Sequence, residues 1–156
     1  MDRIEGYLAR VVNFFLVIQG IGLVVLIGLE VFFRYVVGKA LSWPEEVALI
    51  FFVWFTLLGI VAGVREDNHI AFSYLARKTP PLVGKIISLS CILMIQVYAF
   101  FLIYYGYAYA ELFAFEKTSA ARINLLWMNL SLPISGVLIF FFTLLRAVRL
   151  FKPQKG

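Results

Sequence analysis

Apolar residues fill four long stretches of this chain, and the charged residues gather between them. No acidic or basic side chain occurs in residues 11–29, 47–64, 86–110 and 123–145. A helix needs about 20 apolar residues to cross the hydrocarbon core of a bilayer, so each stretch is long enough for one crossing. The pattern predicts an all-α integral membrane protein, built as a small helical bundle. Its four transmembrane helices are expected at about residues 6–35, 43–65, 83–110 and 124–151.

The composition agrees with this prediction. Of the 156 residues, 63% are hydrophobic, whereas soluble domains have roughly 45–50%. Four helices and short loops use up the chain, so we expect a single membrane domain over residues 1–156. The first apolar stretch is longer than that of a signal peptide and lacks an A-x-A-like cleavage site, so it is expected to be a retained helix.

The basic residues predict an orientation in the membrane. The formal net charge of +5 reflects Lys and Arg that flank apolar spans, which argues against nucleic acid as a partner. With four spans, one side of the membrane receives Arg3, Arg10, Arg65, Arg77, Lys78, Lys85, Arg146, Arg149, Lys152 and Lys155. The other side receives only Arg34, Lys39, Lys117 and Arg122. The positive-inside rule therefore places both termini in the cytoplasm.

The second span begins with a clear start signal. Ser42 and Glu45 have the S-x-x-E spacing of a capping box, in which each side chain satisfies an otherwise unpaired N–H group. Glu45 and Glu46 also suit the positive end of the helix dipole. Adjacent carboxylates on a helix do not face each other, which argues against acid–base catalysis. We expect capping, together with ion pairs to Arg34 or Lys39.

Glu30 and Arg34 lie four residues apart near the end of the first span. This spacing places them on one helix face with the acid first, which is the favoured order. Mutual neutralisation is the simpler interpretation. The alternative is a charged patch that recognises a partner.

Few polar or small residues interrupt the first two spans. Gln19 is interpreted as the one interior polar group of the first span, with a packing role beside small residues that let helices approach closely. Gly59 and Gly63 form a GxxxG motif in the second span. That motif predicts close helix packing without naming the partner helix.

Pro133 interrupts the fourth span. It either kinks one long helix or starts the second part of a broken one. The hydroxyls of Ser131 and Ser135 are placed to bond backbone groups that the proline leaves free.

The loop after the second span holds the only histidine, His69, followed by a segment at residues 70–78 that predicts a short interfacial helix. One histidine builds neither a bis-imidazole haem site nor a His-rich zinc site. The one cysteine, Cys91, excludes an intramolecular disulfide and a Cys-x-x-Cys motif. The sequence therefore predicts no catalytic, cofactor, metal or substrate-binding residue.

One ordered set of residues runs through most of the chain: Arg34, Tyr35, Trp43, Pro44, Glu45, Glu46, Phe52, Val53, Trp54, Leu58, Gly59, Arg65, His69 and the run 132–136. This set resembles a known family, the small membrane subunit (DctQ type) of tripartite ATP-independent periplasmic (TRAP) transporters. The resemblance covers essentially the whole chain, with its length and span number.

The resemblance implies a division of labour. A large DctM-type membrane subunit is expected to carry the substrate and sodium sites and to move as an elevator, while a periplasmic binding protein delivers the substrate, usually an organic acid. This chain is then an accessory scaffold in the bacterial inner membrane that braces the large subunit and helps dock the binding protein. The residues assigned to structure or interfaces are Arg34, Ser42, Trp43, Glu45, Glu46, Trp54, Gly59, Gly63, Arg65, His69 and Pro133.

Two other classes of protein compete with this interpretation. A self-sufficient small multidrug-type exporter requires a membrane-embedded Glu, and Glu30 is the only candidate, although Arg34 is placed to neutralise it. A membrane enzyme or redox protein is disfavoured by the single His, the single Cys and the lack of paired polar residues at mid-helix.

Overall fold

The computed structural model describes residues 2–65 and 81–151, with the side chains of all except residues 2–4, 81, 82, 85 and 149–151. The long helices in this part of the chain are α1 (Asp2–Phe32), α2 (Trp43–Arg65), α4 (Pro81–Leu112) and α6 (Ser131–Phe151). A π-helical turn, η1 (Phe33–Val37), extends α1, and the short α5 (Leu126–Asn129) precedes α6. The four candidate membrane spans are Glu5–Val37, Trp43–Arg65, Ile86–Leu112 and Leu126–Val148.

The predicted all-α architecture with four long apolar helices is thus confirmed. The helix expected at residues 43–65 has those bounds in the structure. The expected interfacial helix at 70–78 lies outside the described residues. The membrane orientation, with both termini inside, stays a prediction.

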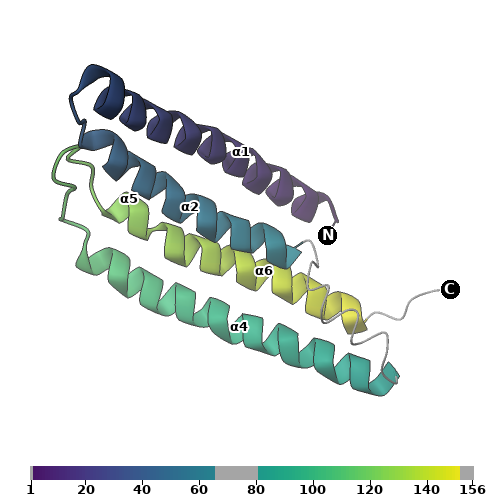
Figure 1. Cartoon of the computed structure of the whole chain (residues 1–156). Coiled ribbons are helices and arrows are strands. Elements are labelled where there is room, and N and C mark those ends of the chain that lie inside the picture. The colour runs from purple at the N-terminus through teal and green to yellow at the C-terminus, as the bar shows by residue number, and fades with distance from the viewer. Residues whose placement is uncertain (1, 66–80, 152–156) are drawn as a thin grey trace.

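The four long helices lie side by side in a single layer (Figure 1). α1 contacts α2, α2 contacts α6, and α6 contacts α4, so that α1 and α4 form the two edges. The expected small bundle is wrong in this respect, because α1 and α4 lie on opposite edges of an open layer. In lipid no hydrophobic force drives apolar helices into a closed bundle. α6 is an inner helix, with 39% of its span buried against 6% for the edge helix α1.

A small apolar core holds the inner helices together. Its buried members come from all four long helices and are Val12, Leu58, Val61, Ala99, Ile139 and Phe142. The layer is tightest where glycine lets two helices approach. A Cβ atom at Gly136 of α6 would lie 2.9 Å from Ile103 of α4, and one at Gly22 of α1 would lie 2.6 Å from Phe51 of α2. Two helical hairpins, α1–α2 and α4–α6, therefore meet along the contact between α2 and α6.

α1 and its π-turn end at a glycine. Gly38 has φ +73° and ψ 13°, the left-handed conformation that glycine adopts without a Cβ penalty. Its N–H donates to the Phe33 carbonyl, and the Lys39 N–H donates to the same oxygen at 3.2 Å. This turn lets the chain reverse into α2 within a few residues.

The fourth span is broken between α5 and α6. Pro133 lies in the first turn of α6, where it has no N–H to donate to the Asn129 carbonyl. The Ser131 hydroxyl donates to the Met128 carbonyl at 2.5 Å, and not to the Asn129 carbonyl that Pro133 leaves free, as the sequence had suggested. Ser135 is fully buried, and its hydroxyl has no hydrogen-bond partner among the described residues. Leu130, which separates α5 from α6, keeps right-handed helical angles (φ −60°, ψ −19°), and its carbonyl accepts the Ile134 N–H at 3.2 Å. The choice between a kink and a second helix start at Pro133 stays a prediction.

Candidate functional site

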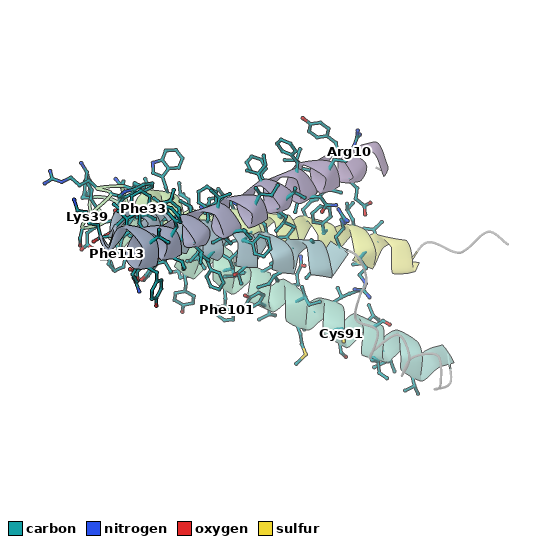
Figure 2. All side chains as sticks on the ribbon, turned by 45° about the horizontal axis from the view of Figure 1, so that its top comes forward. Arg10, Phe33, Lys39, Cys91, Phe101 and Phe113 are labelled. Carbon is teal, nitrogen blue, oxygen red and sulfur yellow. The ribbon has the colours of Figure 1, made fainter. Side chains whose placement is uncertain are left out.

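Several polar contacts between distant parts of the described chain gather at one end of the layer. There the turn between α1 and α2 meets the loop between α4 and α5 (Figure 1). Figure 2 shows Phe33, Lys39 and Phe113 at this end, with Arg10 far from them along α1. We call this region, residues 30–46 and 113–130, the loop end. α1 begins and α6 ends at the opposite end of the layer.

Glu30 and Arg34 form the ion pair that their spacing predicts. The Arg34 Nη2 atom donates to Glu30 Oε1 at 2.6 Å. The Arg34 side chain is 51% exposed and that of Glu30 is 18% exposed. The predicted ion pair is therefore confirmed, while a charged patch that recognises a partner stays a prediction. A carboxylate held by its own helix is a poor candidate for the proton-coupled site of a drug exporter.

Glu46 contacts the backbone of the α4–α5 loop instead of a basic side chain. Its Oε2 accepts the Ala121 N–H at 2.7 Å, and the Ala120 N–H lies 2.9 Å from Oε1 and 3.1 Å from Oε2. The expected ion pair with Arg34 or Lys39 is wrong for Glu46. A carboxylate that accepts backbone N–H bonds is a charge-assisted acceptor, and such bonds are roughly twice as strong as neutral ones.

The other residues at the start of α2 are less engaged. α2 begins at Trp43, immediately after Ser42, where the start signal predicted it. The side chains of Ser42, Trp43 and Glu45 are exposed. Among the described residues the structure contains no capping-box hydrogen bond between Ser42 and Glu45. Pro44 is buried in the first turn, where a missing N–H costs little.

The α4–α5 loop is a compact hairpin that no sequence motif predicted. Lys117 and Asn124 pair as an isolated antiparallel bridge. The Thr118 N–H donates to the Ile123 carbonyl at 2.9 Å, and the Ile123 N–H donates to the Thr118 hydroxyl oxygen at 3.1 Å. Asn124 donates through Nδ2 to the Ala114 carbonyl at 2.7 Å and accepts the Leu126 N–H at 2.8 Å. The loop is therefore held by its own backbone and by Glu46.

Trp54 makes a second hydrogen bond between α2 and the chain beyond the loop. Its indole Nε1 donates to the Trp127 carbonyl at 2.8 Å. The sequence singled out Trp54 as an interface residue, and the structure shows this contact within the chain itself. The bond joins the two helical hairpins at a second point.

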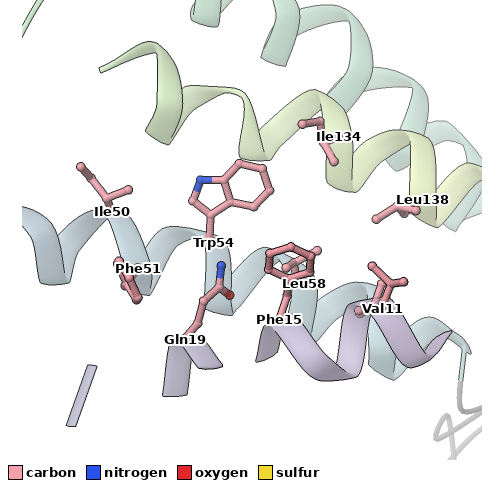
Figure 3. A pocket seen from close by; sticks show the side chains of 10 residues that line it. Val11, Phe15, Gln19, Ile50, Phe51, Trp54, Leu58, Ile134 and Leu138 are labelled. Atoms are coloured by element: carbon pink, nitrogen blue, oxygen red, sulfur yellow. The ribbon is translucent and has the colours of Figure 1, made fainter. Parts of the chain in front are cut away.

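Trp54 also lines a groove of about 400 Å³ between α1, α2 and α6, with walls that are almost entirely apolar (Figure 3). The amide of Gln19 points from α1 toward Trp54, and its oxygen has no hydrogen-bond partner among the described residues. Gln19 is also not the one polar group of the first span, because Asn13 lies there too with an exposed side chain. The groove offers one amide and no charge.

Among the described residues, the GxxxG motif of α2 makes no close helix contact. A Cβ atom at Gly59 or Gly63 would meet nothing within 4 Å, whereas Gly106 and Gly136 lie in close helix contacts. α2 ends at Arg65, whose side chain is half-buried. His69 lies outside the described residues. Over 2–65 and 81–151, no group of three His, Cys, Asp or Glu residues is arranged to hold a metal ion.

These contacts describe a membrane protein with four candidate spans, in which Glu46 and Trp54 join distant parts of its own chain. Residues 23–153 match the family of tripartite ATP-independent periplasmic transporters, DctQ component. The chain belongs to this family, whose members are components of transporters and not enzymes.

Curated relatives agree with the family. The chain is 27% identical over 125 residues to the sialic acid TRAP transporter small permease protein SiaQ of Vibrio cholerae, a match covering 79% of this chain and 71% of that protein. It is 27% identical over 112 residues to the sialic acid TRAP transporter permease protein SiaT of Haemophilus influenzae. That match covers 72% of this chain but only 18% of SiaT, so the matched segment is a small part of a much longer permease.

Proposed function

We propose that this chain is a single-domain accessory subunit of a sodium-coupled TRAP transporter in the bacterial inner membrane. It braces a larger DctM-type subunit that carries the substrate and ion sites. Its termini lie in the cytoplasm and its loop end in the periplasm, where it helps dock the substrate-binding protein. The imported substrate is an organic acid, and sialic acid is the first acid to test because it is named for two relatives.

The single layer of helices is the observation that carries this proposal. A carrier encloses its substrate between elements and places charged or polar ligands near the midplane. This layer has two open apolar sides, and its central stretches hold no acidic or basic residue. The groove beside Trp54 is open to one side and nearly without polar groups. A single layer of this kind is suited to pack against another membrane protein.

The length of SiaT supports a partner in the membrane. In that relative a segment similar to this chain belongs to a permease polypeptide more than five times longer than the match. Joining two components in one polypeptide keeps them at high local concentration, which is useful when they act together. The open small-residue face at Gly59 and Gly63 is suited to close packing with a helix of such a partner.

Co-purification tests the proposed partner. The chain carries an affinity tag and is expressed with a DctM-type large subunit, then extracted in a mild detergent and weighed by native mass spectrometry. We expect one copy of each subunit in a complex that survives 0.5 M salt, because the contact is apolar. A chain that elutes alone under all conditions, while the large subunit is present and folded, would contradict the proposal.

A further inference from the structure

The α4–α5 loop combines order with exposure. Its hairpin hydrogen bonds fix the backbone between Ala114 and Leu126. Phe115, at the start of the hairpin, is 94% exposed, more than any other large hydrophobic side chain in the described part of the chain. An ordered segment that exposes a whole aromatic ring is typical of a protein interface, where aromatic side chains supply much of the binding energy.

The charges around Phe115 favour a protein partner over lipid. Glu116, Lys117 and Arg122 are exposed on the same loop and carry both signs. Mixed charges and exposed backbone resist entry into the bilayer, whereas a polar rim around an aromatic anchor is usual for interfaces between proteins. The loop therefore fits a folded soluble protein that approaches this end of the layer.

Glu46 connects this loop to the membrane helices. Its carboxylate takes the consecutive N–H groups of Ala120 and Ala121, at distances between 2.7 and 3.1 Å. Two neighbouring N–H groups that converge on one anion form a nest. Here the anion is the carboxylate of Glu46, which lies on α2, 74 residues before Ala120. Arg122, next in sequence, has φ +53°, an unusual backbone conformation for a residue with a side chain. The Glu46 carboxylate therefore binds the loop directly before the residue with the positive φ angle.

We propose that Glu46 is the positioning residue of a docking loop. Its carboxylate fixes residues 114–125 on the end of α2, and the loop in this conformation receives the substrate-binding protein through Phe115. The proposal rests on the proposed function, since it names the surface and the residue that prepare the docking step. Glu46 acts through the loop backbone, to which its carboxylate is hydrogen-bonded.

Amide hydrogen exchange tests the positioning role without any partner protein. The full chain is purified in lipid nanodiscs as the wild type and as the variants Glu46→Gln and Glu46→Ala. The control is Glu45→Ala, because the Glu45 carboxylate is next in sequence to Glu46 but exposed. We expect exchange of the Ala120 and Ala121 amides to rise about tenfold in Glu46→Ala, and less in Glu46→Gln, which keeps one acceptor oxygen. Glu45→Ala should exchange like the wild type. Wild-type exchange in Glu46→Ala would overturn the positioning role.

Binding of the substrate-loaded binding protein to the assembled two-subunit complex tests the docking role. We expect Glu46→Ala and Phe115→Ala to raise its dissociation constant by about tenfold or more, a typical loss for an interface anchor. The control Arg10→Ala, far from the loop end along α1, should stay within about twofold. Subunit stoichiometry should be unchanged in all variants, which separates positioning from misfolding. Faster exchange in Glu46→Ala with unchanged binding would overturn the docking role.

Two further outcomes show which part of the proposal is wrong. A wild-type complex that does not bind its binding protein would contradict the docking part of the proposed function, while the exchange result would still decide the role of Glu46. A fluorophore at position 115 tests lipid as the alternative occupant. Quenching by brominated lipid, with no change when the binding protein is added, would show that the loop enters the membrane and would overturn the proposed surface.

Discussion

At the scale of single residues, two carboxylates at the loop end have different partners, and only one partner could be predicted from the sequence. Glu30 and Arg34 share one helix, so their spacing alone predicts the 2.6 Å ion pair. Glu46 binds main-chain N–H groups of Ala120 and Ala121. Every residue except proline carries such a group, so no residue type in the loop reveals the contact.

The Glu30–Arg34 pair is expected to contribute little to stability. Arg34 is half exposed, and exposed pairs four residues apart on a helix contribute about 0.3–0.5 kcal/mol. A double-mutant cycle with Glu30→Gln and Arg34→Gln, measured by unfolding in detergent, should give a coupling energy of that size that fades in 1 M salt. A coupling above about 2 kcal/mol, or one insensitive to salt, would disagree with the observed exposure.

The hydrogen bond of Trp54 is expected to matter more, because it lies within a membrane span. Trp54→Phe removes the N–H and leaves the Trp127 carbonyl without this donor, which should cost about 1 kcal/mol of unfolding free energy. Trp127→Phe is the matched control, since its main-chain carbonyl still accepts the bond and its ring is 63% exposed. Equal losses in both variants, measured by thermal unfolding, would mean that ring size and not the hydrogen bond is responsible.

At the scale of elements, the apolar stretches predicted the helices well because the membrane sets a minimum length for each crossing. α2 has the expected bounds of 43–65. The fourth span differs because Pro133 lacks the N–H that would continue the helix across Leu130. The GxxxG motif predicted close packing, but in the described part of the chain the close contacts lie at other glycines. Small residues fit many helix partners and do not specify which one they meet.

Glycine substitutions are expected to distinguish helix faces that pack against another helix of the described chain from faces that do not. Gly136→Ala places a Cβ 2.9–3.1 Å from Leu102 and Ile103, including a backbone atom, so it should destabilise the isolated chain by about 1–3 kcal/mol. Gly59→Ala meets nothing within 4 Å and should be neutral or stabilising by up to about 1 kcal/mol, from the better helix propensity of alanine. Thermal unfolding of both variants in the same detergent checks the contrast. A larger loss of stability in Gly59→Ala than in Gly136→Ala would contradict the close helix contact at Gly136.

At the scale of the whole molecule, the layer arrangement was not predictable from the sequence. Helices that are apolar on all sides carry no pattern that marks which face meets protein and which meets lipid. In a soluble protein the need to bury one face would close such helices into a bundle, but lipid removes that requirement. The family was predictable because its residues follow one another in order along the chain, from Arg34 through the run at 132–136.

The open layer and the central stretches of its helices, which hold no acidic or basic residue, lead to the central claim, that this chain serves a transporter without moving substrate itself. Uptake of radiolabelled sialic acid into proteoliposomes under a sodium gradient tests this claim, with the substrate-binding protein added outside. The large subunit with this chain defines full activity, and any other organic acid that the binding protein carries replaces sialic acid if needed. We expect liposomes with this chain alone to take up no more than protein-free liposomes. Uptake by the chain alone at a rate comparable to the full complex would contradict the account.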